Sequence, residues 1–185
     1  MKGKKLLAGI LSAAMVLVTM AFPVFADEQT VSNADELQKA VESAATETTI
    51  TLTADITLDS SLIIDDTKNI TLNLNGKKLG VVDTTYPYYD ENDQETYYYY
   101  YNTIKNSGNL IITGNGTIEG ANNAISSYSG ATLTIENGEL NGLRNYALYN
   151  EGTVTIESGT FEGNPGEWDL MNEGGDVTIN GGSFN

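Results

Sequence analysis

The sequence has 185 residues, with 25 Asp and Glu against 9 Lys and Arg, no His and no Cys, for a formal net charge of −16. Such an acidic chain repels phosphate backbones, which argues against nucleic-acid binding, and it disfavours anionic membranes and polyanionic sugars unless cations bridge the two. The absence of Cys and His excludes disulfides, the usual zinc and copper sites, and nucleophilic catalysis by Ser–His or Cys–His pairs.

Residues 1–26 have the pattern of a secretory signal peptide. Three Lys among the first five residues form a basic start, an apolar stretch follows over 6–21, and Val24 and Ala26 occupy the −3 and −1 positions before a cleavage point. The alternative is a transmembrane anchor, but the apolar stretch is short for one and no stop-transfer charges follow it. We therefore expect an exported bacterial protein that is secreted or held at the cell surface.

Residues 27–48 are expected to form a linker and then one short helix. Asn33 and Glu36 make a capping-box pattern. The apolar residues that follow lie at i, i+3, i+4 and i+7 on one helix face: Leu37, Ala40, Val41 and Ala44. A single amphipathic helix before a series of strand repeats suits a cap over the first coil. A helix that binds a partner is the alternative.

Residues 49–185 carry a repeat whose clearest copy runs from Gly152 to Gly163, as a short alternating strand, a glycine turn and one large apolar residue. Its marker residues are aligned with those of the other copies as follows: Ile111, Thr113, Gly116 and Ile118; Leu133, Ile135, Gly138 and Leu140; Val154, Ile156, Gly159 and Phe161; Val177, Ile179, Gly182 and Phe184. The first apolar residues of these copies are then 22, 21 and 23 residues apart. A period of this size predicts a solenoid, in which Val154, Ile156 and Phe161 point inward.

A second strand recurs in each copy, and a corner follows it. The third residue of this strand is an Asn in three copies and Ser127 in the fourth, and a Gly follows shortly after it. The Asn residues are Asn106, Asn150 and Asn172. Asn and Gly tolerate positive φ, so a sharp corner and a ladder of stacked Asn side chains are expected there. The sequence predicts an all-β, single-stranded parallel β-helix of about 22 residues per coil, with strands about 4.8 Å apart. An antiparallel sandwich is the competing fold, but it needs no fixed period.

The segments TLNLNGKKL, TLTIENGEL, TVTIESGTF and DVTINGGSF resemble the pectate-lyase-like right-handed parallel β-helix family, which includes exported, adhesin-like bacterial surface proteins. The resemblance covers about residues 33–185 and implies right-handed coils. It also implies that enzymes of this class cut or modify acidic polysaccharides, with clustered Asp, bound Ca²⁺ and an Arg or Lys base. These motifs are specific to the architecture and not to the chemistry.

An insertion at residues 84–102 interrupts the repeat and holds eight of the eleven Tyr: Tyr86, Tyr88, Tyr89, Tyr97, Tyr98, Tyr99, Tyr100 and Tyr101. Tyrosines on both sides of an acidic middle predict a hairpin arm, which either replaces a full coil or bulges out of the rod. Tyrosine rings stack on sugars, and their hydroxyls bond to sugar hydroxyls. We therefore expect these residues, with Trp168 on a later turn, to bind glycan or protein. The alternative is that these aromatic rings cover the flank of the rod.

No residue pattern identifies a reaction, and we predict no catalytic and no metal-binding residue. Arg144, the only Arg, is interpreted as a surface charge, and Glu136 and Glu157 share one repeat position as a solvated face or a loose cation site. The acidic middle of the insertion has a faint likeness to a Ca²⁺ loop, but it lacks Gly at the sixth place and an acid at the twelfth. Beyond this weak indication of Ca²⁺, no cofactor is expected.

These features predict a non-catalytic β-helix module, secreted or at the cell surface, for adhesion or for contact with carbohydrate or a host or cell-surface protein. One alternative is a polysaccharide lyase or hydrolase, which needs acids that converge in one groove, and another is a purely structural stalk. The sequence ends on the closing residues of a repeat, Gly182 to Asn185, with no capping helix. We therefore expect further coils or another domain to cover that end.

Overall fold

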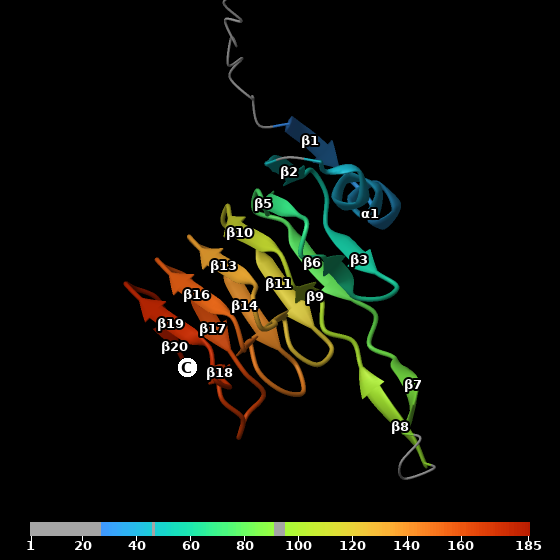
Figure 1. Ribbon diagram of the computed structural model, residues 1–185, viewed down its shortest axis with the longest axis vertical. Coiled ribbons are helices and arrows are strands. Elements are labelled where there is room, and N and C mark those ends of the chain that lie inside the picture. The colour runs from blue at the N-terminus through green and yellow to red at the C-terminus, as the bar shows by residue number, and fades with distance from the viewer. Residues whose placement is uncertain (1–26, 46, 91–94) are drawn as a thin grey trace, which may run out of the picture.

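The computed structural model describes residues 27–45, 47–90 and 95–185, and for residues 86–90 and 95–99 it describes the backbone alone. The chain winds into an all-β parallel solenoid of about six turns with about 23 residues per turn (Figure 1), which confirms the predicted fold class and excludes the antiparallel sandwich. One short helix lies near the N-terminal end of the stack. No helix within the described ranges is long and apolar enough to span a membrane.

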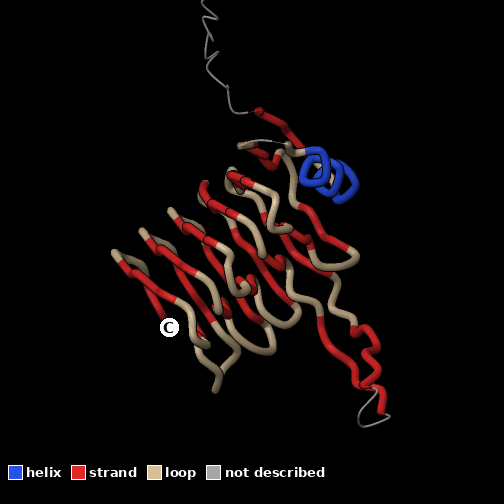
Figure 2. Tube along the Cα trace, viewed as in Figure 1, coloured by secondary structure: helices blue, strands red, loops and turns tan. Residues whose placement is uncertain are grey.

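Each turn contributes strands to three parallel sheets (Figure 2). Sheet A contains β1 (Asp27–Val31), β2 (Thr48–Leu52), β5 (Asn69–Asn73), β10 (Asn109–Thr113), β13 (Thr132–Ile135), β16 (Thr153–Ile156) and β19 (Asp176–Ile179). Sheet B contains β3 (Ile56–Leu58), β6 (Lys78–Val81), β11 (Thr117–Gly120), β14 (Glu139–Gly142), β17 (Thr160–Glu162) and β20 (Ser183–Phe184). Sheet C contains β4 (Leu62–Ile64), β9 (Ile104–Asn106), β12 (Ile125–Ser127), β15 (Leu148–Asn150) and β18 (Leu170–Asn172). The residues before the helix, expected to be a linker, thus include a strand that pairs with β2.

The core is one continuous apolar column inside the stack. Side chains alternate inward and outward along the strands, so in β16 Val154 and Ile156 are buried while Thr153 is exposed and Thr155 is half-buried. Phe161, the large apolar residue of the same repeat, is fully buried. The inward positions predicted for this copy are therefore confirmed.

The register differs from the predicted one in β10. Leu110 pairs with Leu133 and Ile112 pairs with Ile135, and both Leu110 and Ile112 are fully buried. The predicted alignment, which put Ile111 there, is therefore wrong by one residue. Three consecutive apolar residues hid the alternation in this strand, and a shift by one residue moves every side chain to the opposite face.

An Asn ladder closes the corner between sheets C and A, as predicted, but these Asn residues do not have the positive φ that was expected of them. Asn106, Ser127, Asn150 and Asn172 are paired in register on successive turns. Asn150 accepts from the Gly152 N–H at 3.0 Å, while its Nδ2 donates to Gly152 O at 3.1 Å and to Asn172 Oδ1 at 2.8 Å. Asn106 and Asn150 are fully buried, so the ladder satisfies backbone groups that water does not reach.

Helix α1 (Ala34–Ser43) packs against the first turn, and its predicted apolar face is buried: Leu37, Ala40, Val41 and Ala44. Asn33 Oδ1 accepts from the Glu36 N–H at 3.0 Å, as a helix N-cap should. The Glu36 carboxylate accepts from the N–H of Ser32 at 2.7 Å. The predicted capping pattern is therefore present, with the return bond made one residue earlier than in the standard box.

Lys68 caps the other end of the helix. Its Nζ donates to Glu42 O at 2.7 Å and to Ala44 O at 3.0 Å. These carbonyls have no partner within the helix, and a cation near them also complements the helix dipole. Lys68, a residue of the second turn, thereby fastens the helix over the first turn.

The insertion forms an antiparallel hairpin of β7 (Thr85–Asp90) and β8 (Glu95–Tyr100), with Asp90 opposite Glu95, as predicted. Strand β6 pairs with β11, and β4 pairs with β9. The chain therefore leaves the stack after β6 and rejoins it at β9, so the hairpin replaces no turn. Figures 1 and 2 show it projecting sideways from the rod.

The last described turn shows what stacking does for the core. Ile179 is 50 % exposed and Phe184 is 39 % exposed, whereas Ile156 and Phe161, their equivalents one turn earlier, are fully buried. Phe184 stacks on Phe161 with 4.8 Å between ring centroids. At this end of the stack, an inward apolar side chain is thus fully buried only where a further turn covers it.

Replacing Asn150 by Ala should lower the free energy of unfolding by about 2–3 kcal/mol, because the buried N–H of Gly152 loses its acceptor. The matched change Asn172→Ala lies at an exposed rung and should cost about 1 kcal/mol or less. Denaturant unfolding of both variants checks this. Equal losses would show that the buried turn bonds do not stabilise the corner.

The corrected register gives a second test. Ile112→Ala should lower the free energy of unfolding by about 2–5 kcal/mol, as expected for a cavity in a packed core. Ile111→Ala, on the outward side of the same strand, should cost about 1 kcal/mol. If denaturant unfolding gave the reverse order, the one-residue shift in β10 would be refuted.

Candidate functional site

Six of the predicted binding tyrosines lie in the hairpin where the structure describes the backbone alone: Tyr86, Tyr88, Tyr89, Tyr97, Tyr98 and Tyr99. Their register is clear, since Tyr86 is opposite Tyr99 and Tyr88 is opposite Tyr97. Residues 91–94, in the acidic middle that suggested a Ca²⁺ loop, lie outside the described residues. The binding role of this part of the hairpin stays a prediction.

The base of the hairpin is held by Arg144, from the loop between β14 and β15. Its guanidinium makes a two-point ion pair with Asp83, with 2.5 Å from Nη1 to Oδ1 and 3.0 Å from Nη2 to Oδ2. Nη1 also donates to Ala121 O at 3.2 Å, and the guanidinium carbon lies 3.8 Å from the centroid of the Tyr100 ring. Asp83 precedes the hairpin and Tyr100 ends it, so one side chain holds both of its ends.

Arg144 is therefore a surface charge, as the sequence indicated, but it also has a structural role that the sequence did not reveal. The planar guanidinium matches a carboxylate at two points and lies on an aromatic face, which a Lys does not reproduce. The hydrogen bond that Arg144 donates to Asp83 raises the pKa of Arg144 above its usual value. Both side chains are about a third or more exposed, so the pair adds at most about 1 kcal/mol of stability, and its effect is mainly on the direction of the hairpin.

Tyr101, the last of the predicted tyrosines, is half-buried where the chain rejoins the stack. Trp168 lies in the loop between β17 and β18 and is 66 % exposed, so it does not pack on the flank of the rod. Its loop stacks on the Arg144 loop, because the Asn164 N–H donates to Asn145 O at 2.8 Å. The structure thus brings Tyr100 to Arg144 and places Trp168 one turn further along the same corner.

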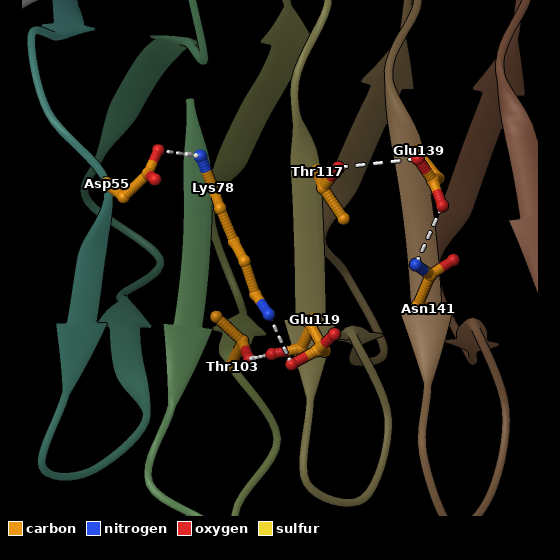
Figure 3. A network of polar contacts seen from close by, with 7 residues as sticks. All are labelled: Asp55, Lys78, Thr103, Thr117, Glu119, Glu139 and Asn141. Atoms are coloured by element: carbon orange, nitrogen blue, oxygen red, sulfur yellow. Dashed lines mark hydrogen bonds and ion pairs between the residues drawn. The ribbon is translucent and has the colours of Figure 1, made fainter. Parts of the chain in front are cut away.

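A polar network covers part of the outer face of sheet B (Figure 3). Lys78 Nζ lies 2.6 Å from Glu119 Oε1, and the Lys78 N–H donates to Asp55 Oδ1 at 2.9 Å. Thr103 Oγ1 donates to the backbone oxygen of Glu119 at 2.5 Å. These contacts tie three successive strands of the face together.

Glu139 belongs to the same face. Its Oε1 accepts from Asn141 Nδ2 at 2.8 Å and its Oε2 from Thr117 Oγ1 at 3.4 Å, as Figure 3 shows. Each carboxylate of the network is therefore bonded to a neighbour in the sheet. Such a face can exchange hydrogen bonds with a hydroxyl-rich ligand, whereas glycoside hydrolysis needs two carboxyl groups set on either side of the bond that breaks.

Glu136 and Glu157 occupy equivalent places after β13 and β16, as their repeat position predicted. Both oxygens of Glu157 accept from Asn180 Nδ2, at 3.0 and 3.1 Å. Within the ranges that the structure describes, no group of three or more Asp, Glu, His or Cys is placed to hold a metal ion.

Sequence reasoning missed two grooves that border sheet B. The larger, of about 490 Å³, follows the corner with sheet A, and the smaller, of about 170 Å³, lies beside Leu143 on the other side. Asn137 lines the first and Asn141 the second, and the side-chain oxygen of each is buried without a hydrogen bond in the described part of the chain. The signal that could have found the larger groove is the Asn-or-Ser, Gly, Thr-or-Glu triplet repeated at each of these turns.

Comparison with protein-family models, with curated proteins and with solved structures finds no match for this chain. The parallel β-solenoid is thus established from the structure itself. Kinship with pectate-lyase-like or adhesin-like proteins remains an expectation from the sequence motifs.

Arg144→Ala should loosen the hairpin without unfolding the rod. Amide exchange in β7 and β8 should become at least about tenfold faster, because both ends of the hairpin lose their anchor. The free energy of unfolding should change by about 1 kcal/mol or less. Hydrogen exchange with mass spectrometry and denaturant unfolding measure the two quantities.

Related variants separate geometry from charge. Asp83→Asn should resemble Arg144→Ala, and Arg144→Lys should lie between Arg144→Ala and the unsubstituted protein, since Lys keeps the charge but not the two-point contact. Lys39→Ala, an exposed change on the helix, is the control and should leave hairpin exchange unchanged. Unaltered hairpin exchange in Arg144→Ala would show that Arg144 does not anchor the hairpin.

Proposed function

We propose that this chain is an exported, non-catalytic β-solenoid module that contacts carbohydrate or protein at a surface through its tyrosine-rich hairpin. The observation that carries this proposal is that the hairpin replaces no turn of the stack, and yet its base is fixed by Arg144. A segment that the rod does not need, held in one direction by a rigid scaffold, suits presentation to a partner.

The composition of the hairpin supports contact with sugars or protein. A tyrosine combines a large apolar ring with a hydroxyl, and few rotatable bonds are frozen when it binds. The chain as a whole is strongly acidic, with a formal net charge of −16, so a neutral or basic partner is favoured over a polyanion. Export is supported by the signal-like pattern of residues 1–26.

Polysaccharide cleavage is the alternative, and the described residues support it less. Glu119 is ion-paired with Lys78, and both oxygens of Glu139 are bonded to neighbours. Arg144, which could serve as a base in a lyase, is engaged with Asp83 and Tyr100. A purely structural stalk is also less well supported, because a stalk has no use for a projecting, anchored hairpin.

The test replaces residues 84–101 by a short Gly–Ser turn and compares binding to a glycan array and to a panel of cell-surface proteins. We expect binding to fall at least about tenfold, while thermal stability stays the same because no turn of the stack is removed. A full-length variant with Tyr97, Tyr98 and Tyr99 changed to Ser should lose binding as well. Equal binding by all three proteins would exclude the hairpin as the contact, and release of sugar products from a polysaccharide panel would favour the enzyme.

A further inference from the structure

The groove between sheets A and B has walls that repeat from turn to turn. On the sheet B side the register pairs Thr117 with Glu139 and Glu139 with Thr160. On the other side lie two amides and a hydroxyl, from Asn115, Asn137 and Ser158. The groove, of about 490 Å³, extends along the rod over successive turns. A ligand that lies in it therefore meets a polar side chain on each wall at each turn, about 4.8 Å apart.

The floor of the groove is glycine because nothing else fits. Gly138 has φ +113° and Gly159 has φ +126°, a region that side chains rarely adopt. A Cβ on Gly159 would also lie 2.9 Å from Gly138 O, and a Cβ on Gly138 would lie 3.3 Å from Gly116 O. Because this column carries no side chains, the groove is continuous along the axis rather than a row of separate pits.

The walls both donate and accept hydrogen bonds. Thr117, Ser158 and Thr160 contribute hydroxyls, and Asn137 contributes an oxygen that is buried and accepts no bond in the described chain. A buried acceptor without a donor destabilises the free protein. If the Asn137 side chain turns toward the groove, a hydroxyl of a ligand can supply the missing donor.

We propose that this groove binds a single extended chain of a neutral polysaccharide, which runs parallel to the rod. A repeating wall suits a repeating ligand, and mixed donors and acceptors suit sugar hydroxyls. Glu139 in the wall and the net negative charge of the chain disfavour the binding of a polyuronate. The inference rests on the proposed carbohydrate contact and deepens it, but it uses a surface separate from the hairpin.

The test titrates the ¹⁵N-labelled chain with cellohexaose, laminarihexaose, mannohexaose and hexagalacturonate, and follows the amide shifts by NMR. At least one neutral hexamer should shift the amides of Gly116, Gly138 and Gly159. Its affinity should rise from the dimer to the hexamer, as more turns are engaged, and should exceed that of hexagalacturonate by about tenfold or more. No shift at these glycines with any neutral hexamer, or tighter binding of hexagalacturonate, would overturn the proposal.

Two variants locate the binding. Asn137→Ala and Thr160→Val should each weaken it by roughly three- to tenfold, the effect of one hydrogen bond. The same chemical changes on the outer face of sheet A, Asn109→Ala and Thr155→Val, should leave the affinity unchanged. Equal affinity in the groove variants and the controls would overturn the proposal.

The hairpin deletion described above separates the groove proposal from the proposed function of the hairpin. It should leave the glycine shifts and the hexamer affinity intact, even though it removes contact through the hairpin. Loss of the glycine shifts on deletion would place the hexamer on the hairpin and overturn the groove. Groove binding that persists in a protein whose hairpin proves inert would overturn the hairpin function alone.

Discussion

The constraint on which this structure depends is the in-register stacking of successive turns. Each inward residue must meet its equivalent on the next turn, as Val154 does with Leu133 and Val177, or the core is left open. Two of the three corners are fixed by the same demand. The corner between sheets C and A needs the buried Asn ladder, and the corner between A and B needs glycines whose φ is positive. The corner between B and C varies most in length, and it carries the hairpin, the Arg144 loop and the Trp168 loop.

Three of the scarce positive charges link segments that are distant in the sequence. After residue 26 the chain has six Lys and Arg against 25 Asp and Glu. Lys68 closes the end of the helix, Lys78 joins strands β6 and β11 through Glu119, and Arg144 fixes the base of the hairpin. Each contact is at least partly exposed, so these residues contribute little to stability and act mainly on geometry. Apart from the Lys78–Glu119 pair, backbone pairing and apolar burial define the regular turns.

The sequence was sufficient wherever a local pattern defines an element. The period, the inward face of β16, the Asn ladder, the helix and the hairpin all follow from such patterns. It was insufficient at β10, where three apolar residues in a row erased the alternation that sets register. It was also insufficient for Arg144, whose partner Asp83 lies 61 residues away in the chain. The groove could not be predicted for another reason. Turn geometry alone explains its glycines in the sequence, and only the structure shows that they line a continuous groove.

The two proposed contact surfaces lie at opposite edges of sheet B. The groove runs along its border with sheet A, and the hairpin leaves from its border with sheet C. Because β14 contributes Glu139 to the groove and the loop after β14 contributes Arg144 to the hairpin base, the two surfaces share one strand of a rigid sheet. The direction of the hairpin relative to the groove is therefore set by Arg144. A ligand that engages both surfaces must therefore span this fixed geometry, whether it is one long chain or several chains of an extended surface.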